Sequence, residues 1–227
     1  MAIPAAVAGG WRGRCYQLGS CLIPAMAVST GARLLLPVRQ YYVQTDSRVP
    51  GQAYRMCFSS TCAMAVKYLQ PDALKGANAD DTYLHTVRRY GDTTSAQAQI
   101  SACADYGVVA TYSTSGDRTL LERELRSGYP VATGFLHHGP SSAPRGGGHW
   151  ILAIGYEPGA GLFNDPYGEL DNINGGYVRV GSGGQAVAYS WRHWLPRWEV
   201  EGSGSGWCMT FRRSDGLPPP DWRPVQA

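Results

Sequence analysis

The sequence is poor in charged residues and has no long apolar stretch. Asp, Glu, Lys and Arg make up 16% of the 227 residues, against about 25% in an average globular protein. Disordered chains are rich in charge and poor in apolar residues, so this composition excludes a largely disordered protein. The longest apolar runs, such as residues 34–38, are far shorter than the roughly 18 residues that cross a bilayer. We therefore expect no membrane span.

Three further signals are missing from the chain. Lys and Arg are scattered and the formal net charge is only +3, so nucleic acid is not an expected partner. The six cysteines include no Cys-x-x-Cys pair and no regular spacing, which predicts neither a structural zinc site nor a disulfide framework. We expect no metal and no cofactor. Arg12 and Arg14 lie where an export signal needs its apolar core, so no cleaved signal peptide is expected.

Glycine, proline and aromatic residues are plentiful, and their distribution predicts an α+β fold. The 29 Gly and 15 Pro residues indicate many tight turns, which argues against a helical bundle. Helical patterns come first in the chain and strand patterns follow, an order typical of α+β proteins. Helices are predicted at 56–70, 80–90, 95–106 and 118–126. Strands are predicted at 34–44, 131–136, 150–156, 161–163, 177–180, 186–189 and 207–211.

The composition divides the chain into three parts. Residues 1–33 are rich in Ala and Gly, nearly free of charge and without periodicity, so we interpret them as an extended arm that docks on a partner. Residues 34–213 hold the predicted elements and form the folded domain. Residues 214–227 contain several prolines and are predicted to be an extended tail.

The start of the helix at 56–70 places a cysteine where it can be reactive. Cys57 opens this helix, and a helix N-terminus favours a thiolate over a thiol. Cys62 follows five residues later, about 140° away around the helix axis, so the two cannot face one site. Taken alone, a cysteine is more often a small buried apolar residue.

A histidine and an aspartate add to this pattern. His149 follows three glycines and enters an apolar strand, and Asp165 ends the next predicted strand. If a turn at 157–160 joins the two strands in an antiparallel hairpin, both residues lie at the same end of it. Taken alone, His149 is more often a hydrogen-bonded structural residue, and Asp165 is more often part of a simple Asp-Pro turn. Together with Cys57 they make the thiolate, imidazole and carboxylate set that acyl transfer requires.

Three blocks carry a resemblance to a known family. They read CFSSTCAMA at 57–65, GHWILAIGY at 148–156 and NDPYG at 164–168. They resemble papain-like cysteine peptidases of the bacteriocin leader-peptidase (double-glycine peptidase) type, most closely phage-encoded lysis or virion proteins, over about residues 36–211. The resemblance implies a papain-like fold, with a buried nucleophile helix in an N-terminal helical half and a C-terminal antiparallel sheet.

The same resemblance assigns roles and a substrate. It implies Cys57 as nucleophile, His149 as general base and acid, and Asp165 as the residue that orients His149. The expected function is a cysteine endopeptidase for peptidoglycan, acting as a virion-associated lysin or endolysin in the phage virion or the host cell envelope. A protease for protein substrates and a virion structural or adaptor protein are the alternatives. Phage structural proteins would then bind the arm at 1–33.

Two glutamines are candidates for the oxyanion hole. Gln44 ends the predicted strand, as in the resembled family, whereas Gln52 precedes Cys57 by five residues, as in papain. Either side-chain amide can donate a hydrogen bond to a developing oxyanion.

Two other groups of residues have weaker claims to function. His137 and His138 are neighbours on a predicted strand and should point to opposite faces, which argues against a shared metal. Trp191, Trp194 and Trp198 have near-helical spacing, which is more typical of a core stripe than of a sugar-binding platform.

Overall fold

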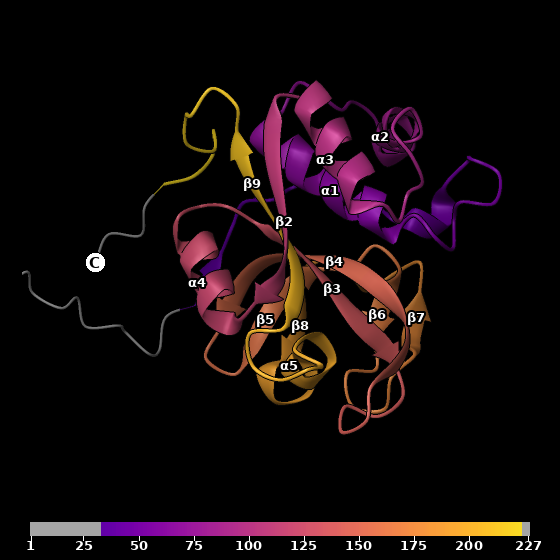
Figure 1. Ribbon diagram of the computed structural model, residues 1–227, viewed down its shortest axis with the longest axis vertical. Coiled ribbons are helices and arrows are strands. Elements are labelled where there is room, and N and C mark those ends of the chain that lie inside the picture. Colours follow the sequence, from indigo (N-terminus) through magenta and orange to yellow (C-terminus); the bar gives the residue numbers. More distant parts are fainter. Residues whose placement is uncertain (1–32, 224–227) are drawn as a thin grey trace, which may run out of the picture. The chain divides into compact units, whose positions relative to one another are not determined.

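The computed structural model describes residues 33–223 (Figure 1). Its helices are α1 (Cys57–Leu69), α2 (Ala79–Val87), α3 (Ala96–Asp105), α4 (Arg118–Arg126) and α5 (Trp191–Trp198), with a 3-10 turn η1 (Gln44–Asp46). Its strands are β1 (Leu34–Leu35), β2 (Val108–Gly116), β3 (Val131–His138), β4 (Arg145–Glu157), β5 (Ala160–Asn164), β6 (Gly168–Leu170), β7 (Tyr177–Val180), β8 (Val187–Ser190) and β9 (Gly206–Arg213).

An antiparallel sheet forms the second half of the fold. Its strand order is β2-β9-β3-β4-β5-β8, and β1 also pairs with β4, while β6 and β7 form a separate two-stranded sheet. Helices α1, α2 and α3 gather on one side of this sheet in Figure 1, and α1 contacts both α2 and β4. Helices early in the chain and antiparallel strands late in it confirm the predicted α+β class.

Helix α1 is the buried helix that the sequence predicts. Eleven of its 13 residues are buried, and its small side chains let the neighbouring elements approach closely. Its buried hydroxyl groups all have partners: Ser59 Oγ lies 2.7 Å from Thr93 Oγ1, and Thr61 Oγ1 donates to the Trp150 carbonyl at 2.9 Å. These bonds tie the helix to the loop before α3 and to β4, so its N-terminus has a defined place against the sheet.

Side-chain caps define where two helices begin. Asp117 precedes the predicted helix at 118–126, and its residue type predicts an N-cap. Its Oδ1 accepts a hydrogen bond from the Leu120 N–H at 2.6 Å, which confirms this cap of α4. For α3 the spacing of Thr94 and Gln97 predicts a capping box with Thr94 as the cap, and this prediction is wrong. Ser95 has the extended backbone of a cap, and its Oγ accepts from the Ala98 N–H at 3.2 Å.

The N-terminal strand prediction is largely wrong, whereas the other predicted strands are present with shifted ends. Only Leu34–Leu35 pairs with β4, because Pro37 has no N–H and the chain then leaves the sheet. Gln44 lies in η1 rather than at a strand end. Strands β2 and β6 were not predicted. The tryptophan-rich segment forms α5, whose Trp191, Trp194 and Trp198 are buried, which confirms their assignment to the core.

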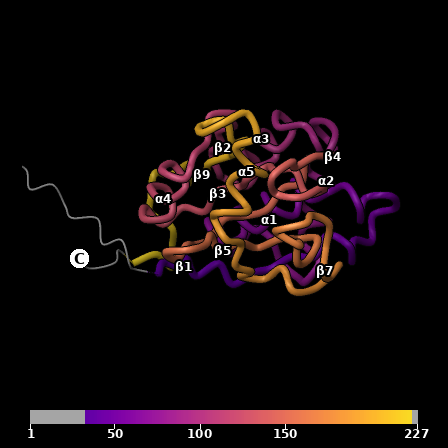
Figure 2. The backbone as a smooth tube through the Cα atoms, turned by 90° about the horizontal axis from the view of Figure 1, so that it is seen from below, coloured from indigo at the N-terminus to yellow at the C-terminus, as the bar shows by residue number. Residues whose placement is uncertain are grey.

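The ends of the described chain lie on one side of the molecule (Figures 1 and 2). Asp221 and Pro37 line the same small pocket, in agreement with both views. The last described residues contact the body, since a Cβ on Gly128 would lie 2.4 Å from Trp222. The predicted arm at 1–33 falls outside the described residues except for Arg33, as do residues 224–227 of the predicted tail. Within residues 33–223, no helix has the length and apolar character that a bilayer crossing requires.

Candidate active site

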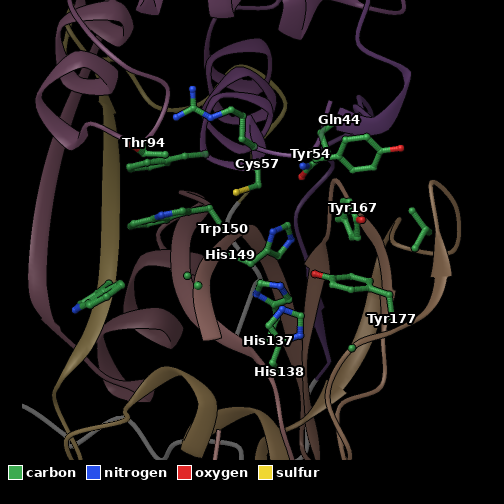
Figure 3. Close-up of a pocket in the computed structure, with 17 residues that line it drawn as sticks. Gln44, Tyr54, Cys57, Thr94, His137, His138, His149, Trp150, Tyr167 and Tyr177 are labelled. Carbon is green, nitrogen blue, oxygen red and sulfur yellow. The ribbon is translucent and has the colours of Figure 1, made fainter. Parts of the chain in front are cut away.

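A cleft of about 740 Å³ lies where the start of α1 meets the sheet (Figure 3). Cys57, the first residue of α1, is half-buried and lines this cleft. The first turn of a helix has backbone N–H groups without intrahelical partners and carries the positive end of the helix dipole. A thiol in this place is accessible to a substrate that enters the cleft.

His149 and Asp165 come together as the hairpin prediction requires. Strands β4 and β5 are antiparallel, with Leu152 opposite Asn164, so His149 and Asp165 lie at the same end. The His149 Nε2–H donates to Asp165 Oδ1 at 2.8 Å, and both side chains are buried. Because Nε2 is occupied by Asp165, Nδ1 is the ring nitrogen left to face Cys57, which lines the same cleft.

The surroundings of His149 favour its protonated form. Burial alone would lower the pKa of this histidine, but the charges of Asp165 and Cys57 and the hydrogen bond to Asp165 outweigh burial and raise the pKa from 6.5 to about 10. The imidazole can therefore hold a proton beside the cysteine over a wide pH range. A protonated imidazole can act as a general acid, because it can donate this proton to an amine that leaves when an amide bond is cleaved.

Asp165 is fully buried and receives four hydrogen bonds. Besides His149, the backbone N–H of Tyr167 donates to Oδ1 at 3.0 Å, and the hydroxyls of Tyr177 and Tyr189 donate to Oδ2 at 3.2 and 3.0 Å. Burial and the charge of Asp165 raise the pKa of both tyrosines, which keeps them as donors. Sequence reasoning did not identify Tyr177 and Tyr189 as partners of Asp165, and the only related signal in the sequence is its high tyrosine content.

The structure distinguishes the two candidate glutamines by position. Gln44 lines the cleft with Cys57 and is almost completely buried. Its Nε2 donates to the Ala53 carbonyl at 3.1 Å, and its backbone N–H donates to the Pro166 carbonyl at 2.9 Å, so the amide is held in place from two sides. Gln52 is not among the residues that line the cleft. Of the two, only Gln44 is brought to the cysteine.

The residues that follow Cys57 and His149 stack on each other. Phe58 and Trp150 lie with ring centroids 3.8 Å apart and planes 2° from parallel. This stack connects the first turn of α1 to β4 and holds the cysteine near the histidine. Cys62 is absent from the cleft lining. Its Sγ lies 3.9 Å from Met209 Sδ in the core, and burial raises its pKa.

The prediction for His137 and His138 is wrong. Both side chains line the cleft, and their ring centroids are 4.0 Å apart. The β3–β4 pairing shifts its register between Leu136 and His138, and such an irregularity turns consecutive side chains away from strict alternation. Within residues 33–223 no group of three or more His, Cys, Asp or Glu side chains is arranged to hold a metal ion.

Comparison with known proteins places the chain in a family. Residues 38–192 match the model described as the Peptidase_C39 like family, and this span includes all three sequence blocks. The chain belongs to this family. C39-like peptidases are cysteine peptidases, and therefore hydrolases, which is the activity class that the three blocks implied.

A solved structure agrees with this assignment. The crystal structure of a protein described as a C39-like peptidase from Bacillus anthracis matches with a TM-score of 0.52 and 12% identity. The match covers 80% of this chain and 98% of that one. At this identity the likeness shows the fold alone, which confirms the expected peptidase-type architecture. No curated protein matches the chain.

Proposed function

We propose that the chain cleaves an amide bond through a covalent thioester. Cys57 attacks the carbonyl carbon, and the Gln44 amide together with the N–H groups of the first turn of α1 stabilises the oxyanion. The tetrahedral intermediate collapses with rupture of the C–N bond, and the His149 proton goes to the leaving amine. The neutral imidazole then takes a proton from water, whose oxygen attacks the thioester carbonyl; the C–S bond breaks and the acid leaves, which restores the Cys57 thiolate and the protonated His149. Asp165 holds the ring in the required orientation.

One observation carries this proposal. Cys57, at a helix N-terminus, shares a cleft with His149, whose other ring nitrogen is bonded to the buried Asp165. This is the nucleophile, base and orienting group of acyl transfer, recognised by geometry and role rather than by sequence position.

For the substrate we propose peptide bridges of peptidoglycan, with the chain acting as a phage endopeptidase in the virion or at the host cell envelope. The resemblance of the MCFSS, GHW and DPYG segments to phage lysis and virion proteins supports this choice. The arm at 1–33 would then bind phage structural proteins. A protease for protein substrates is the alternative within the same chemistry.

Zymography on purified peptidoglycan, with mass spectrometry of the products, tests this function. We expect clearing by the wild-type protein, no clearing by Cys57→Ala, and near-normal clearing by the matched control Cys62→Ala, because Cys62 lies outside the cleft. Equal loss of clearing in Cys57→Ala and Cys62→Ala, with both variants folded, would contradict the role of Cys57 as nucleophile.

Thiol labelling tests the adaptor alternative. A structural adaptor needs no activated cysteine, whereas the proposed enzyme does. We expect iodoacetamide at mildly acidic pH to label Cys57 faster in the folded than in the unfolded protein. No acceleration on folding, combined with no cleavage of peptidoglycan or protein, would favour the adaptor.

A further inference from the structure

The cleft is lined by cationic and imidazole groups and by no carboxylate. Its lining contains one arginine, Arg55, and three histidines, and neither Asp nor Glu is among the described residues that line it. A cleft lined by groups of one sign concentrates ligands of the opposite sign, because its apolar walls focus the field. The chemistry of the lining therefore favours an anionic group on the substrate.

The histidines extend from the cysteine toward one end of the cleft. In Figure 3, His149, His137 and His138 lie one after another below Cys57. Burial, followed by the charges of His149 and His138, lowers the pKa of His137 to about 4, so this ring stays neutral. His138 is exposed at the end of the row. It offers a ring N–H to a ligand in either protonation state.

Two guanidinium groups flank His138. Arg145 is exposed and lies directly opposite it in the β3–β4 ladder. Arg197 is fully buried, and its guanidinium donates to five backbone carbonyls, including that of His138 at 3.4 Å. Within residues 33–223, neither arginine forms an ion pair with a carboxylate.

One carboxylate, that of Asp171, acts on the charge of Arg197 at this end. Asp171, on the turn between β6 and β7, accepts hydrogen bonds from the Ile173 N–H and from the backbone and side-chain amides of Asn174. At the opposite rim of the cleft the charge of Arg55 is compensated, because Asp92 pairs with Arg55 at 2.9 Å. The charge of Asp171 compensates part of the charge of Arg197. Arg145 has no carboxylate partner within residues 33–223, so a net positive charge remains at the His138 end.

We propose that this end of the cleft binds a carboxylate of the substrate, so that the enzyme acts on acidic peptides. The inference rests on the proposed peptidase function and names its substrate class. His138 donates a hydrogen bond to the carboxylate, and Arg145 and Arg197 supply the positive field. A hydrogen bond to a charged carboxylate is stronger than one to a neutral amide. In such a field we expect the difference to lower the dissociation constant of the ligand about tenfold.

A binding measurement tests the proposal without requiring cleavage. Full-length Cys57→Ala protein, labelled with 15N on histidine, is titrated with the N-acetylated tetrapeptide amide Ala-Glu-Gly-Ala and with its Gln twin. His138→Gln in the same background assigns the His138 ring signals. We expect these signals to shift and to saturate at about tenfold lower concentration of the Glu peptide.

Two variants act as controls. Arg145→Gln should reduce the preference for the Glu peptide, whereas His85→Gln, on an exposed face of α2 outside the cleft, should leave it unchanged. Equal binding of both peptides, binding that leaves the His138 signals unmoved, or saturation by neither peptide would overturn the proposal. Failure of the wild-type protein to cleave peptidoglycan is measured separately and would count against the proposed function alone.

Discussion

Asp165 and His149 show how burial and charge act on single residues at this site. Asp165 lies beyond the reach of water, and each of its oxygens has two donors: His149 and the Tyr167 N–H for Oδ1, Tyr177 and Tyr189 for Oδ2. A buried carboxylate is costly unless it is fully hydrogen-bonded. The two tyrosine hydroxyls, which donate to Oδ2, therefore support the orientation of the histidine through Asp165.

We expect Tyr177→Phe and Tyr189→Phe to have different effects. The Tyr177 hydroxyl donates only to Asp165, so its loss should lower kcat a few-fold with little change in KM, and should lower Tm less than the loss of the Tyr189 hydroxyl does. The Tyr189 hydroxyl also accepts from the Leu170 N–H at 3.0 Å. Its loss leaves that buried N–H without a partner, which should lower Tm by about 4–8 °C. Steady-state kinetics and thermal unfolding of both variants measure this, and identical Tm values would contradict the assignment.

The raised pKa of His149 predicts a pH-dependent stability. The folded state binds this proton more tightly than the unfolded chain, because the pKa rises from 6.5 to about 10. The resulting stabilisation is fully present below pH 6.5 and is lost as the pH rises through about 10. We expect the difference in unfolding free energy between wild type and His149→Gln to shrink across this window. Denaturant unfolding at several pH values measures the difference, and a constant value would be inconsistent with the ion pair.

At the scale of elements, Arg197 connects three segments that come from distant parts of the sequence. From α5 it donates to carbonyls at the end of β3, at Gly139, and in the turn after β6. The same segments carry His138 and lead into β7 with Tyr177. The guanidinium fork thus holds one end of the cleft together, which a single-point cation cannot do as well.

Replacing Arg197 should loosen this end of the cleft. Arg197→Met removes every donor and leaves buried carbonyls without partners, so we expect a loss of stability of about 3 kcal/mol or more. Arg197→Lys should lose less, because an ammonium keeps the charge but reaches fewer carbonyls. Thermal unfolding and hydrogen exchange at residues 137–139 and 172–176 report the effect. Unchanged exchange in Arg197→Met would show that the segments are held by other contacts.

At the scale of the whole molecule, residues 33–223 include the sheet and the residues that line the cleft. The N-terminal part of this body begins at β1, where Leu34 and Leu36 are buried in the core. Arg33 adds an exposed ion pair with Glu157 at 3.7 Å, which contributes little stability. Burial in the core therefore extends to Leu34, and the separate role of the arm at 1–33 stays a prediction.

Truncation at two positions tests that boundary. A protein starting at Leu34 should stay folded and keep nearly full activity, while losing incorporation into any assembly that the arm docks on. A protein starting at Pro37 also loses Leu34 and Leu36, and should be destabilised by several kcal/mol, at about 1.5–3 kcal/mol for each buried side chain. Unfolding curves, activity and co-sedimentation with the parent assembly distinguish the outcomes. If the first truncation unfolds, residues before Leu34 belong to the core.

Local features of the sequence were sufficient for much of the fold. The run without Gly or Pro at 56–70 predicts α1, the cap Asp117 predicts the start of α4, and the two strands with a turn at 157–160 predict the β4–β5 hairpin. Each depends on residues only a few positions apart. The same hairpin pattern is enough to place His149 and Asp165 at one end of adjacent strands, and the three blocks are enough to indicate the family.

Other features depend on contacts between distant segments, and only the tertiary structure decided them. Gln44 reaches the cleft because the chain leaves the sheet after β1 and returns to contact Pro166. His137 and His138 share one face because of a register shift, which is a property of paired strands and not of one strand. Tyr189 reaches Asp165 across 24 positions of sequence. No local sequence pattern specifies these contacts, because they follow from how the sheet, the helices and the long loops pack together.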